Sequence, residues 1–139
     1  MATMHADYQD RERIVFTSRG RSFVNVRTKL DDGPIGYSST ELLLLALGNC
    51  TLGALLNQPL LTDVAVGRAE ATLDAEMVPN PARVVKIDID IDVEVEDASL
   101  LDHRDELEAL ACTCPICNTL GNVEITTKLN LTAREPVPA

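Results

Sequence analysis

The fold is decided by Leu42-Leu-Leu-Leu-Ala-Leu-Gly-Asn-Cys-Thr-Leu-Gly-Ala-Leu-Leu56, a stretch that is apolar at nearly every position. Such a pattern predicts a helix that is buried on most of its sides. Ser38 or Ser39 can cap it, and Glu41 lies in its first turn, where the helix dipole favours an acid. A chain of 139 residues has little other material to cover this helix, so we expect a second subunit to cover it.

The segment before this helix has the pattern of a β-hairpin. Two short apolar runs, 14–16 and 23–26, flank the turn signal Ser18-Arg-Gly-Arg21. Residues 30–37 are rich in Gly, Pro and Asp, and we expect them to form a loop.

The segment after the helix predicts two long paired strands. Apolar and polar residues alternate through 69–77 and again through 85–95, so each strand has one buried face. Pro79-Asn-Pro81 turns the chain between them. Val64 and Val66 fall in the opposite phase, which predicts a bulge near 67–68.

A second helix and a last strand complete the pattern. Asp97 or Ser99 can cap a helix whose apolar residues run to Cys114, where Pro115 breaks or kinks it. Alternation in residues 123–131 predicts the final strand. The order of elements indicates an α+β fold with a mostly antiparallel sheet. We expect one domain over residues 1–139, frayed at 1–12 and 133–139.

Charge and hydropathy exclude several classes of partner. The formal net charge is −10, which disfavours nucleic acid and anionic membrane surfaces, because both are bound through Lys and Arg. The N-terminus has no apolar region of a secretory signal. The apolar stretch 42–56 is shorter than the roughly 20 residues of a membrane span. We therefore expect a cytoplasmic protein that binds neither nucleic acid nor membrane.

Four cysteines carry the possible chemistry: Cys50, Cys112, Cys114 and Cys117. If a new helical turn starts at Pro115, Cys114 is its N-cap, a position that favours a thiolate. The C-x-x-C spacing from Cys114 to Cys117 suits a redox pair or half of a metal site. A zinc site needs a fourth ligand, and only Cys50 or His103 could supply it, so we expect neither metal nor cofactor.

Two motifs resemble the OsmC/Ohr family, the osmotically inducible and organic hydroperoxide resistance proteins. Ser39-Thr-Glu-Leu-Leu-Leu-Leu-Ala-Leu-Gly-Asn-Cys50 is similar to the family's P-x-E-L-L-L-A-A-L-G-x-C segment. Cys114-Pro-Ile-Cys-Asn-Thr-Leu120 is similar to its C-P-V-S-x-x-L motif. The resemblance covers about residues 13–131. It implies an intertwined homodimer with mostly antiparallel sheets and two central buried helices.

The resemblance also implies a thiol-dependent peroxidase for organic hydroperoxides in oxidative stress defence. The Cys50 thiolate attacks the peroxide and becomes a sulfenic acid, Cys114 condenses with it to a disulfide, and an external dithiol reduces the pair. An Arg and a Glu of the family hold the thiolate. We assign these roles to Arg27 and Glu41.

The chain departs from the family pattern at several positions. Ser39 replaces a proline, Thr40 stands where the best peroxidases have the Glu, Cys117 replaces a serine and Cys112 is additional. Arginines at 13, 19 and 21 are alternatives to Arg27. Two other functions therefore stay open: a non-catalytic protein that binds a small apolar ligand, and a thiol redox sensor or thiol-transfer protein.

Overall fold

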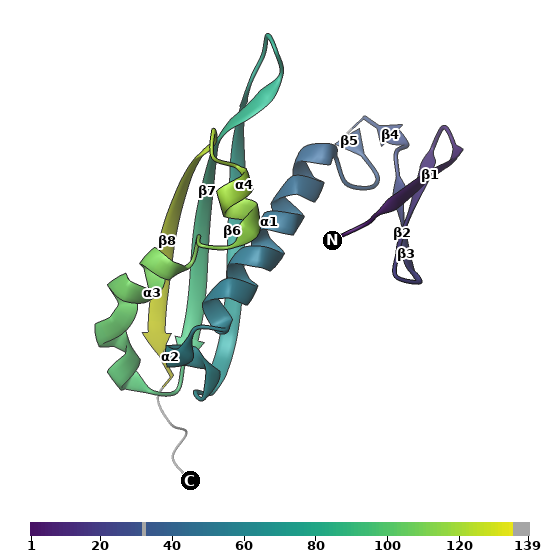
Figure 1. Cartoon of the computed structure of the whole chain (residues 1–139). Helices are drawn as coiled ribbons and strands as arrows, with labels where there is room; N and C mark the ends of the chain where they lie inside the picture. The colour runs from purple at the N-terminus through teal and green to yellow at the C-terminus, as the bar shows by residue number, and fades with distance from the viewer. Residues whose placement is uncertain (32, 135–139) are drawn as a thin grey trace. The chain divides into compact units, whose positions relative to one another are not determined.

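The computed structural model describes residues 1–31 and 33–134, and these form two compact units, Met1–Leu43 and Leu44–Ala139 (Figure 1). The expectation of a single domain over residues 1–139 stays a prediction. Most of the C-terminal segment that we expected to be frayed, 135–139, lies outside the described residues.

The first unit contains a three-stranded antiparallel sheet of β1 (His5–Asp10), β2 (Arg13–Ser18) and β3 (Arg21–Val26). The predicted hairpin is β2–β3, and its turn places Arg19 and Gly20 at positive φ. Phe16 and Phe23 stack across it with ring centroids 5.0 Å apart. Within the segment 1–12 that we expected to be frayed, His5–Asp10 pair with β2, with a register shift between Tyr8 and Asp10.

A short ladder of β4 (Lys29–Leu30) and β5 (Gly33–Pro34) begins one residue before the expected loop 30–37 and otherwise lies within it. The side chain of Asn25 fixes the end of this loop. Its amide donates to the carbonyl of Tyr37 at 2.9 Å and its oxygen accepts from the Tyr37 amide at 2.8 Å. Gly36 must be a glycine, because a Cβ there would come within 2.4 Å of the Val26 oxygen.

Helix α1 (Ser39–Leu56) begins with a capping box. The Glu41 amide donates to the Ser38 hydroxyl at 3.1 Å, and the Ser38 amide donates to the Glu41 carboxylate at 2.9 Å. Ser38 is therefore the cap. The buried residues of this apolar helix are only four: Leu47, Gly48, Thr51 and Leu55. The short α2 (Pro59–Thr62) follows.

The second unit contains a mixed sheet in the order β6 (Val66–Val78), β7 (Arg83–Val95) and β8 (Glu124–Ala133). β6 and β7 are antiparallel, and β8 runs parallel to β7. The predicted alternation is confirmed along β7, where the apolar residues from Ile87 to Val95 are buried. The predicted bulge is confirmed as a register shift between Val66 and Arg68.

The polar face of this sheet is a ladder of carboxylates. Asp74 stands opposite Asp88 on the neighbouring strand. The carboxylates of β7 therefore repel those of β6. On the β8 side of β7, Asn130 relieves part of the repulsion among the carboxylates, because its side-chain amide donates to both Asp90, at 2.7 Å, and Asp92, at 2.8 Å.

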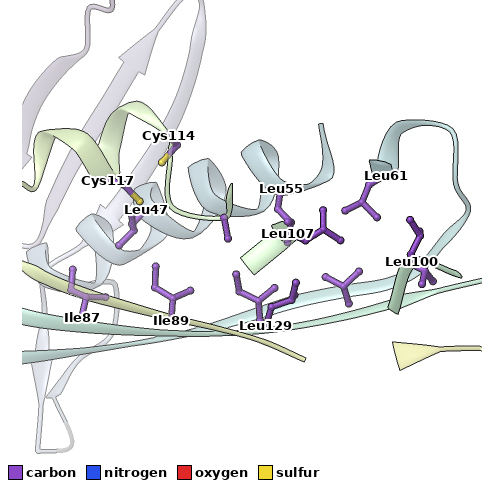
Figure 2. Close-up of a cluster of buried hydrophobic side chains, with 14 residues drawn as sticks. Leu47, Leu55, Leu61, Ile87, Ile89, Leu100, Leu107, Cys114, Cys117 and Leu129 are labelled. Atoms are coloured by element: carbon purple, nitrogen blue, oxygen red, sulfur yellow. The ribbon is translucent and has the colours of Figure 1, made fainter. Parts of the chain in front are cut away.

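The apolar face of the sheet carries the core. Figure 2 shows the labelled α1 side chains, Leu47 and Leu55, on one side of this cluster and the labelled β7 and β8 side chains, Ile87, Ile89 and Leu129, on the other.

Two further short helices complete the core. They are η1 (Ala98–His103) and α3 (Arg104–Leu110), where we expected one helix running to Cys114. Asp97 caps η1 by accepting from the Ser99 amide. Glu108 of α3 accepts from the Leu129 amide on β8 at 2.9 Å, which ties α3 to the strand.

Candidate active site

Cys50 and Cys114 are the free cysteines of the chain, and their side chains are hydrogen-bonded to each other. Cys50 lies on α1, and Cys114 comes directly before α4 (Pro115–Thr119). Cys114 is only 3% exposed, whereas Cys50 is half-buried. The two sulfurs that the sequence singled out, 64 positions apart, therefore lie next to each other.

Cys114 is the N-cap of α4 and Pro115 is its first residue, as we predicted, but the expected use of the helix amides was wrong. Cys114 has extended backbone angles, and its side chain makes no capping hydrogen bond. The backbone amide of Ile116 donates instead to the sulfur of Cys50. Cys50 lies in the middle of α1, away from the N-terminus of its own helix, and this donor comes from α4, which packs against it.

The pKa of the Cys50 thiol is raised above its ordinary value. The largest cause is burial, because an apolar environment disfavours the thiolate, and the hydrogen bond with Cys114 acts in the same direction. The Ile116 amide opposes both by favouring the thiolate. Within this unit Cys50 is therefore mainly a thiol at neutral pH, and rapid nucleophilic chemistry needs a further positive group.

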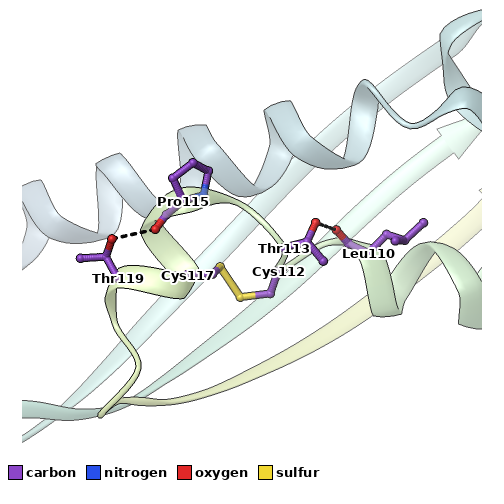
Figure 3. Close-up of a disulfide and its surroundings, with 6 residues drawn as sticks. All are labelled: Leu110, Cys112, Thr113, Pro115, Cys117 and Thr119. Carbon is purple, nitrogen blue, oxygen red and sulfur yellow. Dashed lines mark hydrogen bonds between the residues drawn. A yellow bond between two sulfur atoms is a disulfide. The ribbon is translucent and has the colours of Figure 1, made fainter. Parts of the chain in front are cut away.

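Cys112 and Cys117 form a disulfide, with an S–S distance of 2.20 Å and a Cα–Cα distance of 5.7 Å (Figure 3). The C-x-x-C pairing of Cys114 with Cys117 that the spacing suggested is therefore not the bond in this state. Thr113 and Thr119 stabilise the two ends of the loop by donating to the carbonyls of Leu110 and Pro115.

Arg27 and Glu41 belong to the first unit. Arg27 follows β3, and its side chain is exposed and lines a cavity of about 220 Å³ together with Tyr37 and Ser38. The carboxylate of Glu41 is held in the capping box, and its hydrogen bonds with the Ser38 amide and hydroxyl lower its pKa. The described side chains form no ion pair between Arg27 and Glu41. Both nevertheless lie near the same residue, Ser38.

The arrangement can carry out two-electron thiol chemistry. A sulfenic acid on Cys50 would have the Cys114 thiol beside it, so that a disulfide could form with loss of water. The part of the chain that the structure describes contains no cluster of three or more His, Cys, Asp or Glu that could hold a metal ion.

Sequence reasoning missed one functional group, the Ile116 amide. A backbone amide is not marked by any residue type, so no sequence motif can point to it. It is found only from the structure, in which Cys50 lies close to the first turn after Pro115. The pairing of Cys112 with Cys117 was also missed, because a spacing of five has no familiar signature.

A family model described as OsmC-like protein matches residues 30–129. No sequence among curated proteins matches the chain significantly.

Solved structures show the same fold. An OsmC-like protein from Mycoplasma pneumoniae superposes with a TM-score of 0.77 at 13% identity, over 95% of this chain and 97% of that one. An OsmC-like protein of unknown function from Vibrio cholerae gives 0.78 at 13% identity, over 94% and 99%. An organic hydroperoxide resistance protein of Bacillus subtilis gives 0.59 at 19% identity, over 96% and 98%.

Proposed function

The chain belongs to the OsmC-like protein family, and on that basis we propose that it is a thiol-dependent peroxidase that reduces organic hydroperoxides. The observation that carries this proposal is the hydrogen-bonded pair of free cysteines, Cys50 and Cys114. Structural neighbours that include organic hydroperoxide resistance proteins support the general theme.

The proposed reaction uses one sulfur for attack and one for resolution. The Cys50 thiolate attacks a peroxide oxygen, the O–O bond breaks, and the alkoxide leaves as the alcohol after taking a proton. Cys50 is then a sulfenic acid. The Cys114 thiol condenses with it, releasing water and forming the Cys50–Cys114 disulfide, which an external dithiol reduces. The apolar residues around Cys50 favour an alkyl hydroperoxide over hydrogen peroxide.

We propose that Arg27 supplies the positive charge that Cys50 lacks in its own unit, with Glu41 as a positioning residue at the cap of α1. A guanidinium stays ionised when partly buried and offers several donors. The cavity between Arg27 and Ser38 is a place where an acidic group could be bound.

We infer further that the working form is a homodimer in the cytoplasm. Most of α1 is only partly buried although it is almost wholly apolar, and Leu45 is 56% exposed. α1 is long and apolar enough to cross a membrane, but core helices of soluble proteins have the same length and composition. A second copy of the chain would cover this face.

Mixing the reduced protein with an alkyl hydroperoxide and a dithiol, and following the loss of peroxide, tests the proposed activity. We expect turnover in the native chain and none in Cys50→Ser. Cys114→Ser should lose the intramolecular disulfide while retaining oxidation at Cys50. Absence of turnover, with a small apolar molecule binding near Cys50, would favour the ligand-binding alternative, for which the raised pKa of Cys50 is the supporting observation.

A further inference from the structure

The disulfide between Cys112 and Cys117 surrounds Cys114. Cys114 lies inside the short loop that the bond closes, two residues after Cys112 and three before Cys117. At the same time the Cys114 side chain is hydrogen-bonded to Cys50, and both of these sulfurs are free. The structure thus holds one oxidised pair, Cys112–Cys117, and one reduced pair, Cys50 and Cys114. Cys114 connects the two pairs, because it belongs to the reduced pair and also lies in the loop that the disulfide closes.

All four cysteines belong to one apolar cluster. Cys114 and Cys117 are in its buried part, with 3% and 8% exposure, and Cys50 and Cys112 pack against it. In Figure 2 the sulfurs of Cys114 and Cys117 both lie on the side of the α4 turn that faces Leu47 of α1. Cys112 is half-buried and thus more exposed than either of them. The cysteines therefore lie in a series from Cys50, through two buried sulfurs, to a more exposed one.

We propose that Cys117 and Cys112 take over the oxidation from the Cys50–Cys114 disulfide, so that Cys112–Cys117 is the disulfide which the external dithiol reduces. This inference rests on the proposed function for its first step, the oxidation of Cys50. The state seen here, with Cys112–Cys117 bonded and the other two thiols free, is the product of that transfer.

The transfer consists of two thiol–disulfide exchanges. The Cys117 thiolate attacks the Cys114 sulfur, the Cys50–Cys114 bond breaks, and Cys50 leaves as a thiolate that takes up the proton lost by Cys117. The Cys112 thiolate then attacks the Cys117 sulfur, the Cys114–Cys117 bond breaks, and Cys114 leaves and is protonated in the same way. Each exchange oxidises one pair of sulfurs and reduces another, so neither step needs an external oxidant or reductant. A dithiol finally reduces Cys112–Cys117 and becomes a disulfide itself.

The C-x-x-C spacing has a defined place in this scheme. Cys114 and Cys117 form the intermediate bond, and Cys112 resolves it. The scheme regenerates Cys50 before any reductant arrives, because the oxidation has moved to another pair. A disulfide that only braced the loop would instead leave Cys50–Cys114 as the final product of each peroxide reaction.

Disulfide mapping after a single oxidation tests the proposal. The fully reduced chain is mixed with one equivalent of cumene hydroperoxide and quenched in acid at successive times, after which free thiols are alkylated and peptides are mapped. We expect Cys50–Cys114 to appear first and Cys112–Cys117 to replace it. Cys112→Ser should stop at Cys114–Cys117, and the double variant Cys112→Ser/Cys117→Ser should stop at Cys50–Cys114. Cys50→Ser is the matched control, in which Cys112 and Cys117 should stay reduced.

Two outcomes overturn the transfer. One is a native chain that keeps Cys50–Cys114 while Cys112 and Cys117 are alkylated. The other is a Cys50→Ser chain whose Cys112–Cys117 bond forms as fast as in the native chain, because the peroxide would then oxidise that pair directly.

Failure of the peroxidase proposal gives a different result. The double variant would then show no oxidation of Cys50 by the hydroperoxide. In that case diamide, which oxidises dithiols without a sulfenic acid, replaces the peroxide in the same time course on Cys112→Ser. Decay of Cys50–Cys114 into Cys114–Cys117 supports the exchange, and persistence of Cys50–Cys114 refutes it.

Discussion

The backbone amide of Ile116 donates a hydrogen bond to the sulfur of Cys50. This contact joins the start of α4 to the middle of α1, and it favours the thiolate of Cys50. Burial and the Cys114 hydrogen bond act against it and prevail, so the pKa of Cys50 is raised.

The first prediction concerns the pH dependence of Cys50. Alkylation follows the thiolate fraction, so its rate at Cys50 should rise at higher pH than for an ordinary thiol. Cys114→Ala removes a hydrogen bond and a bulky neighbour, both of which raise the pKa, so the profile should shift to lower pH. Mass spectrometry of the Cys50 peptide measures it. Thr113→Ala is the control, because the Thr113 side chain is exposed and its hydroxyl donates to the Leu110 carbonyl. An unshifted profile in Cys114→Ala would contradict the prediction.

The second prediction concerns Arg27 and Glu41. If Arg27 supports the Cys50 thiolate, Arg27→Ala should raise the pKa of Cys50 further and slow its oxidation. Glu41→Gln keeps an oxygen that can serve the capping box but removes the charge, so it should have a smaller effect in the same direction. The pH profile of Cys50 alkylation measures both.

Substitutions of Arg13, Arg19 and Arg21 are the comparison set for this prediction. A shifted profile for one of them, and not for Arg27→Ala, would assign the role to that arginine. Unchanged profiles for all four would favour the ligand-binding function.

The third prediction concerns assembly. Leu45 on α1 is 56% exposed, and a second copy of the chain should cover it. Leu45→Glu would place a charge in that interface, so the particle should change from dimer to monomer mass in light scattering. Leu101→Glu, on η1 and 41% exposed, is the matched control and should stay dimeric. A native chain that is folded and monomeric at micromolar concentration would refute the dimer.

The fourth prediction concerns the carboxylate ladder. Asn130→Ala removes the donor that bridges Asp90 and Asp92, so the free energy of unfolding should fall by about 1 kcal/mol. Salt screens the repulsion that remains, and the difference from the native chain should therefore shrink as ionic strength rises. Denaturant unfolding at low and high salt measures both effects. The exposed Asn122→Ala should change neither, and a difference that grows with salt would contradict this account.

Much of the fold could be predicted because its pattern is local. The alternation from Ile87 to Val95 reports a strand with one buried face, and the apolar run of α1 reports a core helix. β1 could not be found in this way. His5–Asp10 has no apolar alternation and is a strand only because β2 offers it backbone partners.

The side chains of the site could be predicted from the sequence, but its backbone donor could not. Cys50 and Cys114 could be named from their motifs, and the structure brings them together. The Ile116 donor depends on the packing of α4 against α1, which no local pattern encodes. The single helix expected after Asp97 failed for a similar reason. Its apolar spacing does not distinguish one helix that runs to Cys114 from the 3-10 helix η1 followed by α3, which ends at Leu110.

The Cys112–Cys117 bond also has a thermodynamic consequence. It joins residues only five positions apart, so it removes little freedom from the unfolded chain, and loop-closure entropy assigns it a stabilisation of about 2 kcal/mol. Opening this bond therefore costs less stability than opening a disulfide that closes a long loop. Because of this short separation, Cys112 and Cys117 also stay close to each other in the unfolded chain. The sulfurs of Cys112 and Cys117 can therefore meet through local encounters before the sheet and α1 have come together, but the bond between them forms only when the oxidation from the Cys50–Cys114 pair is passed on.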